Sequence, residues 1–277
     1  VLVFPLSSVT FRFQQIMSGY IYDSIGREYN KSRRADPYLT TRVSLLLQAR
    51  KEGRYLDLGC GTGNYYQALL AQGLQVIGVD PSVVMLQQAL EQCPEGQFVK
   101  AAAEDLPFPP ASFDGVLALF TFHHWTNKEK GLAEVARVLK PGGRFVCLSF
   151  CPEQMKGYWL DEYFPEMMER SWALAPEKPV MERLLIDAGF KIVFTENYSI
   201  QEDLTDHFLY AGKHHPEWYL DPGFRENTSS FRLLADSDEL EYGLHRLEKD
   251  IRSGKVKEVM DSYANDHGDY LFYIAST

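Results

Sequence analysis

The chain has 277 residues and a mass of 31.7 kDa, which suits one large domain or a domain with an added cap. Its net charge of −10 argues against a general affinity for DNA or RNA, so no nucleic-acid partner is expected. It has no apolar run of about 18 residues, so no membrane span is expected. The four cysteines show no metal-binding spacing, which predicts free thiols in a cytoplasmic protein and no metal site.

The N-terminal arm and helix, residues 1–52, begin with an apolar stretch at 1–13 that fits no element of the fold. This stretch lacks the basic region and cleavage site of a signal peptide. A chain start assigned upstream of Met17 is one hypothesis for it. Further on, Thr40 or Thr41 can cap a helix that runs to about Arg50, because apolar residues recur there at helical spacing.

A glycine-rich turn follows the first apolar strand, residues 55–58. Glycines stand at 59, 61 and 63, and a helical pattern covers 65–71. Glycine leaves no Cβ between backbone and ligand and allows positive φ, and the unpaired amides at a helix start attract negative or polar groups. A second apolar strand, 75–79, ends in Asp80, where nucleotide-type folds place a ribose-binding carboxylate. The dinucleotide fingerprint is absent, because its third glycine would fall at Asn64.

The next elements alternate between helix and strand. Pro81 and Ser82 start a helix that ends near residue 93, with Val83, Leu86 and Leu90 as its expected apolar face. Residues 98–99 form the third strand, followed by the run Ala-Glu-Asp-Leu-Pro-Phe at 103–108. A near-continuous apolar strand at 115–119 leads into a loop that carries two adjacent histidines. His124 suits a general base at neutral pH, or pins the loop by a hydrogen bond.

After a helix at 128–139 and a strand at 144–150, residues 151–179 break this rhythm. A helix at 180–188 and a strand at 190–198 restore it. The last strand is expected at 270–275, so about 70 residues intervene, with two readable helices near 240–251 and 256–263.

Three of these motifs resemble the class I S-adenosylmethionine (SAM)-dependent methyltransferases of the methyltransferase type 11 group. They are Asp-Leu-Gly-Cys-Gly-Thr-Gly at 57–63, the run Ala-Glu-Asp-Leu-Pro-Phe with Ser-Phe-Asp at 112–114, and the histidine pair at 123–124. The resemblance implies an α/β, Rossmann-like seven-stranded sheet, order 3-2-1-4-5-7-6, with helices on both faces and an added helical cap. It also implies SAM as the cofactor and methyl transfer to a small, largely apolar or aromatic acceptor.

The same resemblance assigns roles to residues of this chain. Asp57 and the three glycines would meet the methionine part of SAM, Asp80 the ribose, Pro81 and Met85 the two faces of adenine, and Asp105 with the Leu106 amide the adenine edge. An N-terminal arm often folds over the cofactor in this family, although aromatic packing would account for its tyrosines equally well. The complete set of expected cofactor contacts is Tyr22, Tyr29, Arg34, Asp57, Gly59, Cys60, Gly61, Gly63, Asp80, Pro81, Met85, Ala103, Glu104, Asp105, Leu106 and Phe120.

The expected domains are the arm and helix at 1–52, a SAM-binding core at 53–199 plus 267–277, and a helical cap at 200–266 to which 151–179 contributes. Aromatic pocket walls suit an apolar acceptor, and the expected acceptor contacts are His123, Tyr158, Trp159, Tyr210 and Trp218. The cap helices would serve a dimer interface equally well, so the chain is expected as a monomer or homodimer. A tRNA- or protein-modifying methyltransferase, a silent SAM binder and an NAD-dependent oxidoreductase remain as alternatives.

Overall fold

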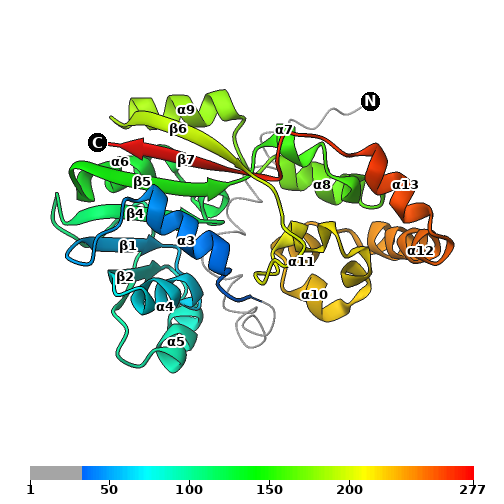
Figure 1. The fold of residues 1–277 in the computed structure, drawn as a ribbon, viewed down its shortest axis with the longest axis horizontal. Coiled ribbons are helices and arrows are strands. Elements are labelled where there is room, and N and C mark those ends of the chain that lie inside the picture. Colours follow the sequence, from blue (N-terminus) through cyan, green and yellow to red (C-terminus); the bar gives the residue numbers. More distant parts are fainter. Residues whose placement is uncertain (1–32) are drawn as a thin grey trace, which may run out of the picture.

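The computed structural model describes residues 33–277, and Tyr22 and Tyr29 lie outside this part of the chain. At its centre is a seven-stranded sheet with the order β3-β2-β1-β4-β5-β7-β6. The strands are β1 (Arg54–Leu58), β2 (Gln75–Asp80), β3 (Phe98–Lys100), β4 (Phe113–Leu119), β5 (Leu139–Ser149), β6 (Lys191–Tyr198) and β7 (Tyr270–Ser276). Strands β1 to β5 pair in parallel, and β7 is antiparallel to both of its neighbours (Figure 1). The predicted α/β sheet and its strand order are confirmed.

Helices cover both faces of this sheet. Helices α3 (Pro37–Leu46) and α4 (Asn64–Ala71) share one hydrophobic core with it, and α6 (Lys128–Val138) and α9 (Lys178–Asp187) share the other. Adjacent residues of β4 show the division, because Val116 and Leu117 are both fully buried and belong to different cores. Central strands buried on both faces are therefore apolar at nearly every position.

The expected start of the first helix was wrong. Asp36 caps α3, and its carboxylate accepts a hydrogen bond from the Leu39 amide at 3.0 Å. Asp followed by Pro is a strong start signal, because the Asp side chain caps the helix and Pro needs no amide partner at the first position. Helix α3 ends at Leu46, before the expected Arg50.

The expected apolar face of α5 (Val83–Gln92) was correct at Leu86 and wrong at Val83 and Leu90. Val83 and Leu90 are 43% and 44% exposed, whereas Met85, Leu86 and Ala89 are buried. Both sets have helical spacing, and the side that packs against β2 and β3 was decided by the sheet.

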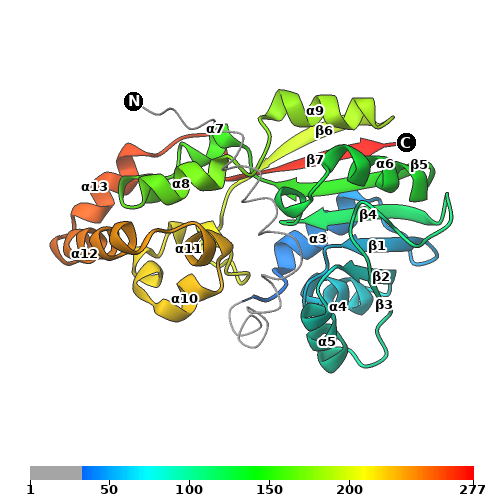
Figure 2. The ribbon, with the colours of Figure 1, turned by 180° about the vertical axis from the view of Figure 1, so that it is seen from behind.

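A second set of helices, here the helical group, lies beyond the edge of the sheet where the parallel strands end (Figures 1 and 2). Its elements come from two segments, one between β5 and α9 and one between β6 and β7. They are α7 (Pro152–Met155), η3 (Trp159–Glu162), α8 (Pro165–Trp172), η4 (Leu209–Lys213), η5 (Pro216–Leu220), α10 (Pro222–Glu226), α11 (Ser229–Leu233), α12 (Ser237–Ser253) and α13 (Lys255–Ser262).

The helical group is joined to the sheet by one continuous core. Leu148 and Phe272 of the sheet belong to the same buried cluster as Met167, Phe231 and Leu247 of the helical group. None of the helices within residues 33–277 has the length and apolar character needed to cross a bilayer.

Candidate active site

The glycine-rich turn between β1 and α4 is held at the carboxyl end of β2. The amides of Gly59 and Cys60 both donate to the Val79 carbonyl, at 2.7 and 2.9 Å. A Cβ on Gly59, where φ is +77°, would lie 2.2 Å from Thr121 Oγ1. A Cβ on Gly61, where φ is +53°, would meet nothing within 4 Å. Glycine is therefore required at 59 by packing, whereas at 61 it keeps a space open above the turn.

Two buried carboxylates lie beside this turn. Asp80 Oδ2 accepts from the Gly61 amide at 3.0 Å, and Oδ1 accepts from the Ser82 amide at 2.9 Å. Asp57 is 3% exposed, and its Oδ2 has no hydrogen-bond partner among residues 33–277. Burial raises the pKa of Asp57 to about 7, with a smaller effect from the charge of Asp80. Burial also raises the pKa of Asp80 to about 6, against the opposing effect of its two amide hydrogen bonds.

A cavity of about 180 Å³ opens above the turn, between the sheet and the helical group. From the sheet side it is lined by Gly59, Cys60, Gly61, Asp80, Pro81, Met85, Phe120, His123, His124 and Phe150. From the helical group it is lined by Met155, Ser171, Leu174, Leu209, Tyr210, Asn227, Thr228, Ser229 and Ser230. The cavity thus joins the expected cofactor turn to a second compartment that no motif predicted.

Phe120 directs the chain into this cavity. It follows β4 and has a φ of +55°, which a bulky residue rarely adopts. Its amide donates to the Leu148 carbonyl at 2.9 Å, and its ring packs against Phe208 and Tyr270 with centroids 4.2 and 5.2 Å apart. Such strain persists only where the surroundings impose it. The bend leads directly into η2 (Phe122–His124) and brings both histidines to the cavity wall.

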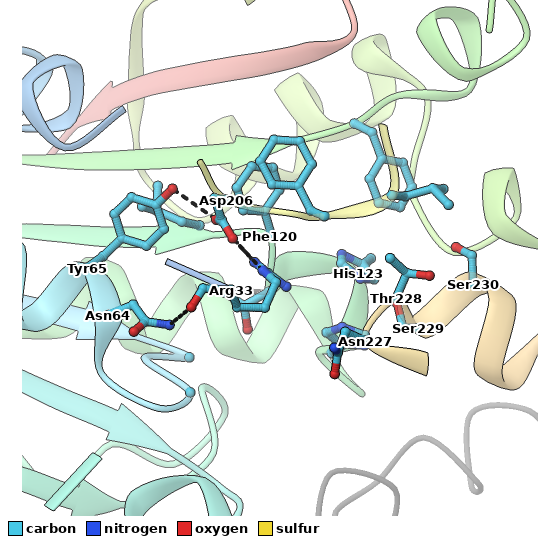
Figure 3. A pocket seen from close by; sticks show the side chains of 18 of the residues that line it. Arg33, Asn64, Tyr65, Phe120, His123, Asp206, Asn227, Thr228, Ser229 and Ser230 are labelled. Atoms are coloured by element: carbon cyan, nitrogen blue, oxygen red, sulfur yellow. Dashed lines mark hydrogen bonds and ion pairs between the residues drawn. The ribbon is translucent and has the colours of Figure 1, made fainter. Parts of the chain in front are cut away.

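Arg33 lies in the cavity beside the glycine turn (Figure 3). Its Nε is 2.5 Å from Asp206 Oδ1, and Asp206 Oδ2 accepts from the Tyr65 hydroxyl at 3.0 Å. Asn64 Nδ2 donates to the Arg33 carbonyl at 3.0 Å. The sequence analysis chose Arg34, which is exposed and does not line the cavity. The reason for this correction is that neighbouring side chains of an extended segment point in opposite directions.

The histidine pair of η2 is neutral. The ring centroids of His123 and His124 are 3.8 Å apart, and that of His123 is 5.0 Å from Phe150. Burial lowers the pKa of His123 well below its usual value, and the neighbouring His124 and Lys128 have smaller effects in the same direction. Burial lowers the pKa of His124 to about 3, and the charge of Lys128 has a smaller effect in the same direction. Both imidazoles can therefore accept hydrogen bonds at neutral pH.

The run at residues 103–106 has a structural role. The Leu106 amide donates to Glu134 Oε2 at 2.9 Å, which contradicts its expected contact with adenine. Glu104 Oε1 accepts from Thr126 Oγ1 and from the Asn127 amide, both at 2.9 Å. These bonds tie the connection before β4 to the start of α6. Ala103 is buried in the core, Asp105 is exposed, and none of the four residues lines the cavity.

Among the aromatic residues expected around the acceptor, Tyr210 reaches the cavity, whereas Tyr158, Trp159 and Trp218 do not. Tyr158 stacks on Tyr210 with centroids 3.7 Å apart. Trp159 Nε1 donates to the Lys213 carbonyl at 3.1 Å, and Trp218 stacks on a histidine of η4–η5, His215, at 4.4 Å. This correction follows from aromatic packing: Tyr158 supports Tyr210, whereas Trp159 packs on Tyr158 and Tyr219, and Trp218 packs on His207 and His215.

Several cavity residues had no signal in the sequence. Ser171, the segment 227–230 and Asp206 lie in short helices and loops without a recognisable spacing. The clearest indication was chemical, because four consecutive small polar residues, Asn227-Thr-Ser-Ser, stand in an otherwise aromatic and acidic region.

Comparison with known proteins gives a consistent result. A family model described as "Methyltransferase domain" matches residues 56–147. The chain is 32% identical to O-methyltransferase cnsE of Penicillium expansum over 193 residues, which is 64% of this chain and 67% of that protein. It is 36% identical to a demethylmenaquinone methyltransferase of Thermotoga maritima over 118 residues, 42% of this chain and 51% of the relative.

A crystal structure assigned as a methyltransferase from an antibiotic biosynthesis pathway of Anabaena variabilis is similar throughout. The TM-score is 0.78 at 32% sequence identity, and the match covers 89% of this chain and 99% of that chain. The similarity therefore extends over the helical group as well as the sheet.

Proposed function

Given that the chain belongs to the class I SAM-dependent methyltransferases of the type 11 group, we propose that it methylates a small, largely apolar or aromatic acceptor. The observation that carries this proposal is the position of the cavity. It extends from the glycine turn to apolar side chains of the helical group, among them Leu174, Leu209 and Tyr210. A pocket with mostly apolar walls and a few polar groups is the usual form of a small-molecule site.

The residues around the turn fit SAM. Asp57 Oδ2 is buried without a partner in the described part of the chain, and the amino group of SAM would satisfy it. The space above Gly61 would admit the methionine part, and Asp80 has carboxylate lone pairs left for ribose hydroxyls. When bound, SAM supplies a methyl group on a positively charged sulfur. Arg33, Asn64 and Tyr65 would close this end of the cavity through their bonds to one another and to Asp206.

The contribution of the protein to the reaction is alignment and exclusion of water. Phe120, Phe150 and Phe208 border the cavity near the turn, and Tyr210 is fixed from behind by its stack on Tyr158. Holding an acceptor in line with the methyl group replaces a bimolecular encounter by a local one, and a dry cavity keeps water from the reacting atoms.

The helical group, as a cap formed by residues 200–266 with 151–179, is proposed to supply the acceptor half of the site. Its support is the set of cavity residues from these segments, Met155, Ser171, Leu174, Leu209, Tyr210 and 227–230. The names of two relatives agree with a small acceptor, one as an O-methyltransferase and one as a demethylmenaquinone methyltransferase.

The test is a transfer assay with SAM labelled in its methyl group. The purified protein is offered a panel of small aromatic compounds, bulk tRNA and an unrelated protein in parallel reactions. We expect label in the small aromatic products. Label only in tRNA or protein would contradict the proposal, especially if the activity fell steeply with salt.

A further inference from the structure

His123 lines the cavity and has a ring nitrogen that no hydrogen bond within residues 33–277 occupies. Its Nδ1 is buried and has no hydrogen-bond partner within residues 33–277. The ring is held by stacking on His124 and Phe150, at 3.8 and 5.0 Å between centroids. His123 as a whole is partly exposed, and it belongs to the cavity lining. A buried imidazole of this kind is placed to bond a ligand, because an unmade hydrogen bond in the interior costs free energy.

The charges around the ring specify what kind of group it can meet. Burial, and to a smaller extent His124 beside it and Lys128 on α6, disfavours a protonated His123. Two carboxylates line the cavity wall: Asp80 accepts from two backbone amides and Asp206 pairs with an arginine. No hydrogen bond from His123 to either is found among residues 33–277. A neutral imidazole nitrogen accepts a hydrogen bond. The ligand group that faces His123 therefore carries a hydrogen, as a hydroxyl does.

The wall opposite is polar but uncharged. It includes Asn227, Thr228, Ser229 and Ser230 (Figure 3). Ser171, which is hydrogen-bonded to Ser230, also lines the cavity. Among the residues that the structure describes, Arg33 is the one lysine or arginine that lines the cavity, and it is paired with Asp206. An anionic acceptor would thus lack a free counter-charge. Neutral hydroxyl and amide groups beside Phe150 and Leu174 suit an aromatic molecule with few polar substituents.

We propose that the acceptor is a neutral phenol or enol, bound with its hydroxyl against His123, and that His123 takes the hydroxyl proton during methyl transfer. This inference rests on the function proposed above. The acceptor oxygen forms a bond to the methyl carbon while the carbon–sulfur bond breaks, and its electron pair stays on sulfur. The hydroxyl proton passes to a ring nitrogen of His123.

The step conserves charge inside the cavity. Before methyl transfer the sulfur of SAM carries one positive charge, and after the transfer the imidazole of His123 carries one. The free-energy cost of a buried, protonated His123 is therefore offset by the loss of the positive charge on the sulfur of SAM. A phenol or enol suits the transfer better than an aliphatic alcohol, because its hydroxyl pKa, about 10 for a phenol, lies closer to that of an imidazole.

The first experiment measures binding rather than turnover. Calorimetry compares 2-naphthol with its methyl ether, 2-methoxynaphthalene, on the protein saturated with S-adenosylhomocysteine. The wild type should prefer the hydroxyl compound about 2- to 10-fold, the net value of one hydrogen bond. His123→Phe should lose this preference, whereas His123→Asn, whose amide oxygen can take the place of Nδ1, should retain it. An unchanged preference in His123→Phe would overturn the proposal.

The second experiment separates proton transfer from positioning. His123→Asn should methylate 2-naphthol about 10²–10⁴ times more slowly than the wild type. The loss should shrink to less than tenfold with pentafluorophenol, which is already ionised at neutral pH. An equal loss with both phenols would reduce His123 to a positioning role and overturn the proposed proton transfer.

SAM affinity, measured by calorimetry on each variant, separates this inference from the proposed function. SAM binding together with methylation of amines, thiols or carboxylates but of no hydroxyl compound would overturn the inference and leave a small-molecule methyltransferase. Methylation of no small molecule at all would overturn both.

Discussion

At the scale of single residues, the site depends on two carboxylates kept away from water. Asp57 and Asp80 are 3% and 9% exposed, and no salt bridge to either is found in the described part of the chain. Burial of a carboxylate favours its protonated form. Without cofactor, Asp57 and Asp80 thus keep protons at a pH at which an isolated aspartate has lost them. A cationic, hydrogen-bonding cofactor would replace these protons.

This arrangement predicts an unusual pH dependence of stability. Aspartates titrate near pH ~4 in the unfolded chain, whereas burial raises the pKa of Asp57 to about 7 in the folded protein. Between these values the folded state binds more protons, so this contribution to the free energy of unfolding falls as pH rises from about 4 to 7. Urea unfolding of the cofactor-free wild type and of Asp57→Asn should show the wild type losing stability relative to the variant over this interval.

The titration of Asp57 and Asp80 should also govern the binding of SAM. The stabilisation added by SAM should grow from pH 5 to 7, because the ionised carboxylates bind it, and should level off above. A SAM effect independent of pH in the wild type would contradict the role of these carboxylates.

The glycines of the turn allow a second prediction. Gly59→Ala places its Cβ against Thr121 at positive φ, so we expect a loss of more than about 2 kcal/mol in the free energy of unfolding. Gly61→Ala adds a Cβ into open space and should cost about 1 kcal/mol while weakening SAM binding. Gly142→Ala is the matched control, because Gly142 also has positive φ (+77°) and open space but lies far from the cavity in a turn of β5. Equal SAM affinities of the Gly61 and Gly142 variants would refute the prediction.

At the scale of elements, the cavity is closed by segments that meet only in the folded chain. Arg33 precedes α3, Tyr65 lies on α4 and Asp206 follows β6. The Asp206 side chain is 2% exposed and that of Arg33 14% exposed. Removing the charge of Asp206 takes away the ion pair of a mostly buried guanidinium, which is costly in a protein interior.

Asp206→Asn should therefore lower the free energy of unfolding by about 3 kcal/mol and raise the rate of SAM dissociation. The matched control is Glu196→Gln, which breaks the more exposed pair with Arg42 on β6 and α3, where the side chains are 25% and 31% exposed. This control should cost at most about 1 kcal/mol and leave SAM dissociation unchanged. Urea unfolding and stopped-flow measurement of SAM release provide both values, and similar losses for the two variants would contradict the prediction.

At the scale of the whole molecule, two compartments share one cavity. The cofactor turn belongs to the sheet, whereas the residues opposite belong to the helical group, and one hydrophobic core connects the two. A larger side chain in the part of the cavity lined by the helical group should therefore impair methylation of the acceptor and leave SAM binding unchanged.

Leu174→Trp should leave SAM affinity within about threefold of the wild type and reduce the turnover of aromatic acceptors at least tenfold, because the larger side chain occupies the apolar wall. Val180→Trp, at a position 48% exposed on α9, controls for the introduced tryptophan and should leave both quantities unchanged. Calorimetry with SAM and the methyl-transfer assay measure them. Parallel loss of SAM binding in Leu174→Trp would show that the two compartments are not separate.

The sequence by itself determined the features that depend on local backbone geometry and on periodicity. Glycines at 59, 61 and 63 encode the turn because they allow its positive φ angles. Alternating apolar segments encode the strands and helices, and the late strand at 270–276 was recognisable in the same way. With the family resemblance, these patterns were enough for the sheet order and the cofactor class.

Only the tertiary structure decided which side chains meet across long separations. Arg33 and Asp206 are 173 positions apart, and no spacing rule connects them. The packing of separate segments decides that Arg33 and not its neighbour lines the cavity. It also decides that the Leu106 amide is occupied and which aromatic rings line the wall. Local propensity leaves such choices open, because side-chain direction is fixed by the partners that compete for each buried surface.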